Sequence, residues 1–70
     1  MQVFSKAVKG FTETYVVKFW YTCSEGYLKQ SSKEFWCNSK SAHRVVEVEA
    51  IKFLLKEGFS GIKIISVIYQ

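Results

Sequence analysis

Several residue types are absent or rare in this chain of 70 residues. It has no proline and no aspartate, and its two cysteines are Cys23 and Cys37. The lack of aspartate excludes most magnesium sites and calcium-binding loops, which rely on that carboxylate. Two cysteines are too few for the disulfide framework of small secreted domains, and no leader-like segment opens the chain, so we expect a cytoplasmic protein. The sequence leaves open whether the two thiols pair.

The chain also has few groups that carry catalysis or hold a metal ion. Cys23, Cys37 and His43 supply three of the four ligands that a structural zinc site uses. Cys37 and His43 are the nearest candidates for a nucleophile and its base, but a histidine in the first turn of a predicted helix is ordinarily solvated. No glycine-rich loop precedes a helix, as a phosphate-binding loop does. We therefore predict that the protein is not an enzyme and has neither a cofactor nor a metal site.

Long hydrophobic runs are missing as well. Lysines or glutamates interrupt each apolar segment before it approaches the roughly 20 residues that cross a bilayer, so we expect no membrane partner. Hydrophobic residues still make up 49% of the chain, which is enough for one core, and the chain is predicted to be a single domain over residues 1–70. The net charge of +4 favours anionic partners. Nine of the ten basic residues are lysines, which lack the bidentate contacts of arginine.

The strands are predicted from runs of β-branched and aromatic residues. Residues 13–23 form the first run, and one of its two parities is plainly apolar. A turn at residues 24–26 ends in a glycine, and a second strand over residues 27–38 follows. The middle of this second strand is polar on both parities, which is typical of an edge. Residues 62–69 are apolar on both parities and predict the last strand.

One helix is predicted between the second and last strands. Apolar residues at helical spacing place it over residues 41–57, after a polar segment at 38–41 that offers capping side chains. Gly58 stands where a left-handed C-terminal cap is expected. The alternative is a further strand over residues 44–49, where three valines gather.

These elements predict an α+β domain with a small antiparallel sheet of three or four strands and one helix on one face. A right-handed crossover places the first long strand between the second and the last. The last strand is then at an edge although both of its faces are apolar. Either residues 2–9 form an extra strand or arm that covers this edge, or a second copy of the chain pairs with it to form a homodimer. The candidate dimer edge comprises Lys63, Ile65, Val67 and Tyr69.

The two tryptophans are the most informative pair of exposed candidates. With a three-residue hairpin loop, Trp20 and Trp36 fall on the face that the helix does not cover. With a two-residue turn they fall on opposite faces and become ordinary packing residues. The candidate partner-binding residues are Lys18, Trp20, Lys29, Lys33 and Trp36.

Two functional hypotheses follow from these surfaces. The first is a small non-catalytic protein-binding or regulatory module, which uses the exposed face or the last edge and binds a protein partner or itself. The alternative is a nucleic-acid-binding module, because aromatic rings on a basic sheet face stack bases while lysines contact phosphates.

Overall fold

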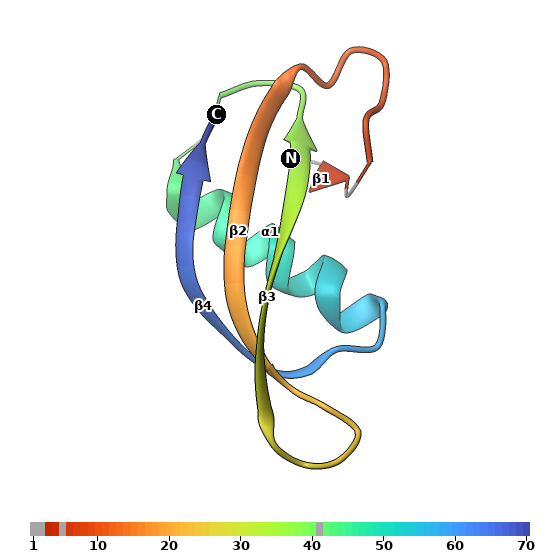
Figure 1. Ribbon diagram of the computed structural model, residues 1–70. Coiled ribbons are helices and arrows are strands. Elements are labelled where there is room, and N and C mark those ends of the chain that lie inside the picture. The colour runs from red at the N-terminus through yellow and green to blue at the C-terminus, as the bar shows by residue number, and fades with distance from the viewer. Residues whose placement is uncertain (1–2, 5, 41) are drawn as a thin grey trace.

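The computed structural model describes residues 3–4, 6–40 and 42–70. The elements follow in the order β1 (Val3–Phe4), β2 (Glu13–Thr22), β3 (Leu28–Cys37), α1 (His43–Lys56) and β4 (Ser60–Tyr69). The strands form one antiparallel sheet in the order β1-β3-β2-β4, and α1 crosses one face of it (Figure 1). The predicted α+β class is confirmed, and so is the place of the first long strand between its two neighbours.

The β2–β3 hairpin has the three-residue loop that the glycine in the turn allows. The Cys23 N–H donates to the Tyr27 carbonyl at 2.9 Å, and Gly26 takes a φ of 89° between them. This loop sets a register in which Thr14 faces Trp36 and Trp20 faces Gln30. Because side chains alternate along a strand, both tryptophans lie on the face opposite α1. The two-residue alternative is therefore wrong.

The helix is shorter than predicted at both ends. It begins at His43 after Ala42 as N-cap, and Ala42 makes no side-chain capping hydrogen bond; residue 41 of the predicted capping segment lies outside the described residues. The predicted left-handed C-terminal cap is present, because Gly58 has a φ of 100° and the Phe59 N–H donates to the Leu54 carbonyl at 3.1 Å. The strand alternative over residues 44–49 is wrong, since that segment is helical.

The core lies between the sheet and α1. Its fully buried aromatic rings are Tyr15 and Phe19 on β2 and Phe35 on β3. The helix contributes side chains spaced four residues apart, which share one face of a helix. The remaining buried members are Val3, Val17, Cys37, Val46, Ala50 and Leu54. All of these side chains lie on one face of the sheet, so the other face has no cover from the described residues.

The N-terminal strand β1 lies at the opposite edge of the sheet from the predicted one. Residues 2–9 were a candidate cover for the edge of the last strand. Instead Val3 pairs with Cys37 and Phe4 with Trp36, so β1 extends the sheet beside β3. The Phe4 ring packs edge-on against Phe11 at 5.0 Å, which holds β1 on that side. The outer edge of β4 is therefore left unpaired among the described residues.

Gly61 is the glycine whose replacement we expect to be most costly. It has a φ of 62°, and a Cβ there would overlap the Thr22 hydroxyl oxygen. Gly61→Ala should lower the free energy of unfolding by about 2 kcal/mol, because it adds this overlap to a disfavoured backbone conformation. Urea unfolding measures the loss.

Gly10→Ala is the matched control for this measurement. Gly10 also has positive φ, 87°, but open space surrounds its Cβ position. It should lose only the backbone contribution of about 1 kcal/mol. Equal losses in the two variants would show that the contact with Thr22 carries no cost.

Candidate functional site

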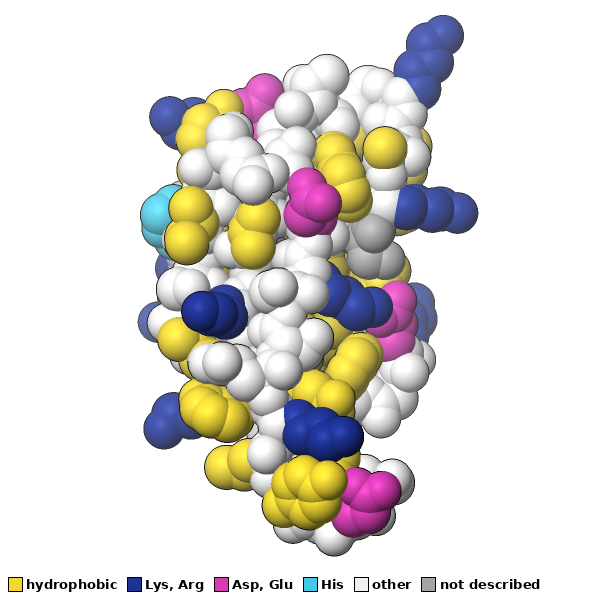
Figure 2. All heavy atoms as spheres, in the orientation of Figure 1, with side chains coloured by type: hydrophobic (Ala, Val, Ile, Leu, Met, Phe, Trp, Pro, Cys, Tyr) yellow, Lys and Arg dark blue, Asp and Glu magenta, His cyan; other side chains and the backbone are white. Residues whose placement is uncertain are grey.

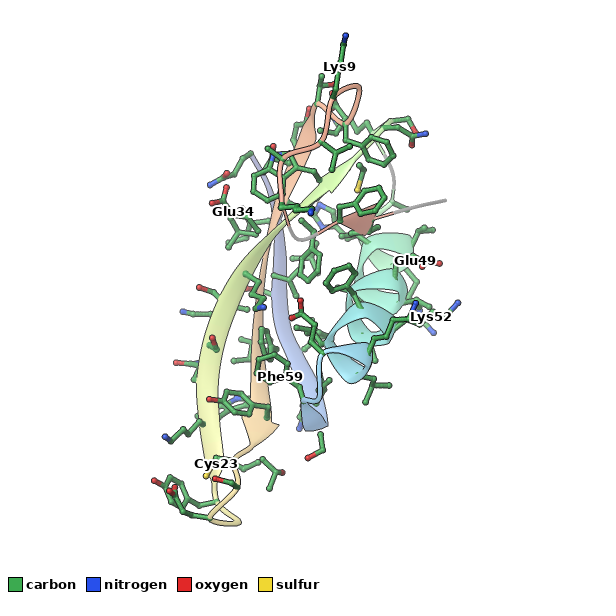
Figure 3. All side chains as sticks on the ribbon, turned by 90° about the vertical axis from the view of Figure 1, so that its right-hand side faces the viewer. Lys9, Cys23, Glu34, Glu49, Lys52 and Phe59 are labelled. Atoms are coloured by element: carbon green, nitrogen blue, oxygen red, sulfur yellow. The ribbon has the colours of Figure 1, made fainter. Side chains whose placement is uncertain are left out.

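The face of the sheet opposite α1 is not covered by any element among the described residues. Figure 2 shows this face, with hydrophobic and lysine side chains interspersed. Figure 3, turned by 90°, shows Glu34 on this side of the sheet and α1 on the other. The register orders the side chains of β3, β2 and β4 into rows across the strands. Successive rows are Gln30, Trp20 and Lys63; Ser32, Lys18 and Ser66; Glu34, Val16 and Ile68; and Trp36 with Thr14.

The first two rows form a basic aromatic cluster, which we call the Trp20 patch: Lys18, Trp20, Gln30, Ser32, Lys63 and Ser66. The Trp20 side chain is 37% exposed, and Lys18 and Lys63 are both exposed. Side chains directly opposite each other on one face of a sheet are about 5 Å apart at Cβ, so Gln30 and Lys63 are the cross-strand neighbours of Trp20. Lys18 stands two residues along the same strand. The exposed Trp20 therefore has one lysine opposite it on β4 and another two residues before it on β2.

The predicted partner-binding residues do not form one cluster. Trp36 shares the uncovered face with Trp20, but its row is six residues away along β2, or about 20 Å. Lys29 and Lys33 have the opposite parity and lie on the face that α1 covers. Lys33 forms an ion pair with Glu57 at 2.6 Å. The structure therefore groups Lys18 with Trp20 and separates the other three.

Lys63 joins the Trp20 patch although its candidate role was at the dimer edge. The signal was present in the sequence, because Lys63 interrupts an otherwise apolar strand. Its row could not be assigned without the pairing of β4 with β2, which has an irregularity in the middle. Lys18 pairs with Ser66 and Phe19 with Ile64, so Ile65 is an extra residue, a β-bulge.

This bulge divides the candidate dimer edge between two faces. Val67 and Tyr69 pair with Val17 and Tyr15 and point to the α1 side. Lys63 pairs with Trp20 and points to the uncovered side. The four candidate edge residues therefore do not all share one face of the sheet, because the extra residue reverses the alternation of side chains. What they share is the strand edge itself.

The outer edge of β4 beyond the bulge exposes backbone groups. The Gln70 N–H donates to the Thr14 carbonyl at 2.9 Å, so Gln70 faces β2 through its backbone. Backbone groups alternate in direction along an antiparallel ladder, and those of Val67 and Tyr69 therefore point away from β2. The exposed side chains Ile65 and Ile68 lie beside them, 41% and 56% exposed. This edge presents both hydrogen-bonding groups and apolar surface.

Tyr69 is fixed in place at the end of this edge. Its hydroxyl donates a hydrogen bond to the Glu13 carboxylate, and its ring packs against Tyr15 at 5.1 Å. The Lys40 ammonium lies 4.7 Å from the ring centroid on the ring face. The hydrogen bond to Glu13 raises the pKa of Tyr69 above its ordinary value. These contacts fix the C-terminal end of β4 in its extended conformation.

The two cysteines are free and lie at opposite ends of the sheet. Cys37 faces Glu13 at the start of β2, whereas Cys23 follows the end of that strand at the hairpin loop (Figure 3). Cys23 is ten residues after Glu13, which corresponds to about 33 Å along the strand. The two thiols are therefore too far apart to pair within one chain. Burial, and then the charge of Glu13, raises the pKa of the Cys37 thiol. Cys37 is therefore a core residue.

A hollow of about 350 Å³ lies between the hairpin and the end of α1. Its walls include Tyr21, Glu25, Lys29, Glu57 and Phe59.

Among the described residues, no three histidine, cysteine or acidic side chains are grouped closely enough to hold a metal ion. The described chain also has no helix with the length and apolar character to cross a membrane. Comparisons with protein-family models, with curated proteins and with solved structures find no match to this chain.

Proposed function

We propose that the chain is a small non-catalytic protein-binding or regulatory module that associates with a second copy of itself through the outer edge of β4. The observation that carries this proposal is the outward direction of the Val67 and Tyr69 backbone groups at an edge where no strand of the described residues pairs with β4. Both cysteines are free, which fits the reducing cytoplasm that we propose as its location.

The contrast between the two edges of the sheet supports this choice. The outer edge of β3 is covered by β1 at Trp36 and Cys37, and the rest of that edge is polar from Lys29 to Glu34. Charged and polar side chains protect an edge from pairing. The β4 edge instead carries isoleucines, valine and tyrosine. Extending the sheet across this edge would remove both apolar side chains and unpaired backbone groups from water.

The bulge limits how two β4 strands can pair. A regular ladder between two β4 strands cannot continue past Ile65 toward Ile64, because the extra residue shifts the alternation of backbone groups. It can run from Ile65 to Tyr69 about a two-fold axis at Val67, which pairs with its own copy while Ile65 pairs with Tyr69 of the second copy. The axis is perpendicular to the sheet, so both helices lie on one side and both uncovered faces on the other.

Ile65→Lys tests this interface. Charge on an edge strand opposes pairing, and the new lysine would also approach the Lys40 that lies over Tyr69 in the second copy. Light scattering over a concentration series should give a mass that rises toward twice 8.1 kDa for the wild-type chain. The Ile65→Lys chain should stay at the monomer mass.

Leu55→Lys is the matched control, because Leu55 is also an exposed apolar residue but lies on α1, away from the edge. It should associate like the wild type. A wild-type chain that is monomeric at every concentration would refute the proposal, as would a dimer that Leu55→Lys splits and Ile65→Lys leaves intact.

A further inference from the structure

We propose that the Trp20 patch binds single-stranded nucleic acid, with a base stacked on the Trp20 indole and the phosphates beside it contacting Lys18 and Lys63. The ligand chemistry is an unpaired base flanked by phosphodiesters, which both RNA and DNA single strands supply. This site lies on the uncovered face, and its binding does not depend on the association of β4 edges.

The position of Trp20 favours stacking with a flat ligand. It lies on β2, an inner strand with β3 on one side and β4 on the other (Figure 1). The adjacent row carries the short side chains of Ser32 and Ser66 on either side of Lys18. Small residues beside an aromatic ring leave room for a base to lie against it. Gln30, opposite Trp20, offers an amide that can donate to or accept from a base edge.

The charges of the patch favour a polyanion over a protein surface. Lys18 and Lys63 make no ion pair within the described part of the chain, whereas the lysines that do, Lys33 and Lys52, lie elsewhere. The acidic residue of the uncovered rows, Glu34, lies in the row beyond Ser32 and Lys18. Two free ammonium groups beside an exposed indole match the phosphate and base of one nucleotide unit. The chain's net charge of +4 adds long-range attraction of the same sign.

The first measurement uses the Trp36→Phe chain, in which Trp20 is the remaining tryptophan. Oligothymidylate of about six nucleotides, within the range of small single-strand sites, should quench its fluorescence as a base stacks on the indole. In the wild-type chain, Trp20→Ala should weaken binding of the labelled oligonucleotide about 10-fold or more. The double variant Lys18→Gln, Lys63→Gln should make the slope of log affinity against log salt shallower by about 1.4, since each phosphate contact on a single strand contributes about 0.7.

Matched variants and ligands separate this site from general charge attraction. Lys52→Gln with Lys56→Gln removes the same charge from α1 and should leave the affinity within about 2-fold at moderate salt. Polyphosphate, which has no bases, should bind the wild type and Trp20→Ala equally. A duplex should bind more weakly than the single strand, and comparing oligouridylate with oligothymidylate tells which sugar is preferred. Circular dichroism of each variant confirms that the fold is kept.

Several results would overturn the proposal. The site is wrong if no oligonucleotide binds at low salt, if the Trp20 fluorescence does not change on binding, or if the α1 double variant loses as much affinity as the Lys18 and Lys63 double variant. An Ile65→Lys chain that binds the short oligonucleotide like the wild type is expected, because one patch on one chain forms this site. That result separates the fate of this proposal from that of the β4 interface.

Discussion

Phe19→Ala should lower the free energy of unfolding by about 3–5 kcal/mol, the usual loss when a buried phenylalanine is truncated. Phe19 is fully buried at the centre of β2, and its ring packs edge-on against Phe59 at 5.6 Å and beside Tyr21 at 6.0 Å. The helix and the loop after it lie against this ring, so the gap cannot be filled by a small shift of one side chain. Small domains have a total stability of only about 5–15 kcal/mol, so this loss leaves little.

Urea unfolding followed by circular dichroism measures the effect, with Leu28→Ala as the control. Leu28 is on the same sheet but 60% exposed, and its truncation should change the free energy by no more than about 0.5 kcal/mol. If Phe19→Ala is too unstable to show a folded baseline, Phe19→Leu keeps most of the volume and gives a smaller, measurable loss. Equal losses for Phe19→Leu and Leu28→Ala would contradict the packing described for the core.

The hairpin shows how much a short sequence signal can establish. Ser24 to Gly26 allow a loop of three residues, and loop length fixes register in a hairpin. Register then decides which face each side chain of β2 and β3 occupies. The uncovered position of Trp20 and Trp36 therefore follows from one glycine and the alternation of side chains. The same rule applied to Lys29 and Lys33 places them on the opposite face, so their grouping with Trp20 conflicts with the parity of their own strand.

The β4 edge shows where the sequence is insufficient. Ile62, Ile64, Ile65, Val67 and Ile68 are apolar on both parities, so a shift of one residue within the strand leaves the pattern unchanged. A bulge in such a segment cannot be located without the partner strand. The bulge matters for the proposed binding site, because it moves Lys63 from the side of Val67 and Tyr69 to the side of Trp20.

The N-terminal strand shows a second limit, which concerns the choice of partner. Val3 and Phe4 have strand character, but a two-residue segment carries no register that distinguishes the edge of β3 from the edge of β4. Tertiary contacts decide the question: Val3 is buried in the core, and Phe4 packs against Phe11 in the connection to β2. That connection returns the chain to the β3 side and leaves the β4 edge open.

The two proposed surfaces are connected by geometry. Pairing of β4 strands about an axis perpendicular to the sheet places both Trp20 patches on the same continuous face. Across the sheet, the two Trp20 indoles are three interstrand spacings apart. Along the strands, they are separated by twice the distance from Lys63 to Val67. The two components give a separation of roughly 25–30 Å. One nucleic-acid strand of sufficient length could therefore contact both patches. Linked contacts of this kind can raise affinity by about 10²-fold or more over a single site.

We accordingly expect an oligothymidylate of about twenty nucleotides to bind the wild-type chain about 100-fold more tightly than one of about six. At protein concentrations where the chain is dimeric, Ile65→Lys should abolish most of this gain while leaving the short-oligonucleotide affinity unchanged. The gain should persist in Leu55→Lys, which keeps the β4 edge. A longer oligonucleotide also offers one patch more positions at which to bind. This raises the apparent affinity only in proportion to the number of positions, and it does so equally in both variants. If Ile65→Lys retains the full 100-fold gain, the two patches do not act on one strand, and the β4 pairing does not place them on a common face.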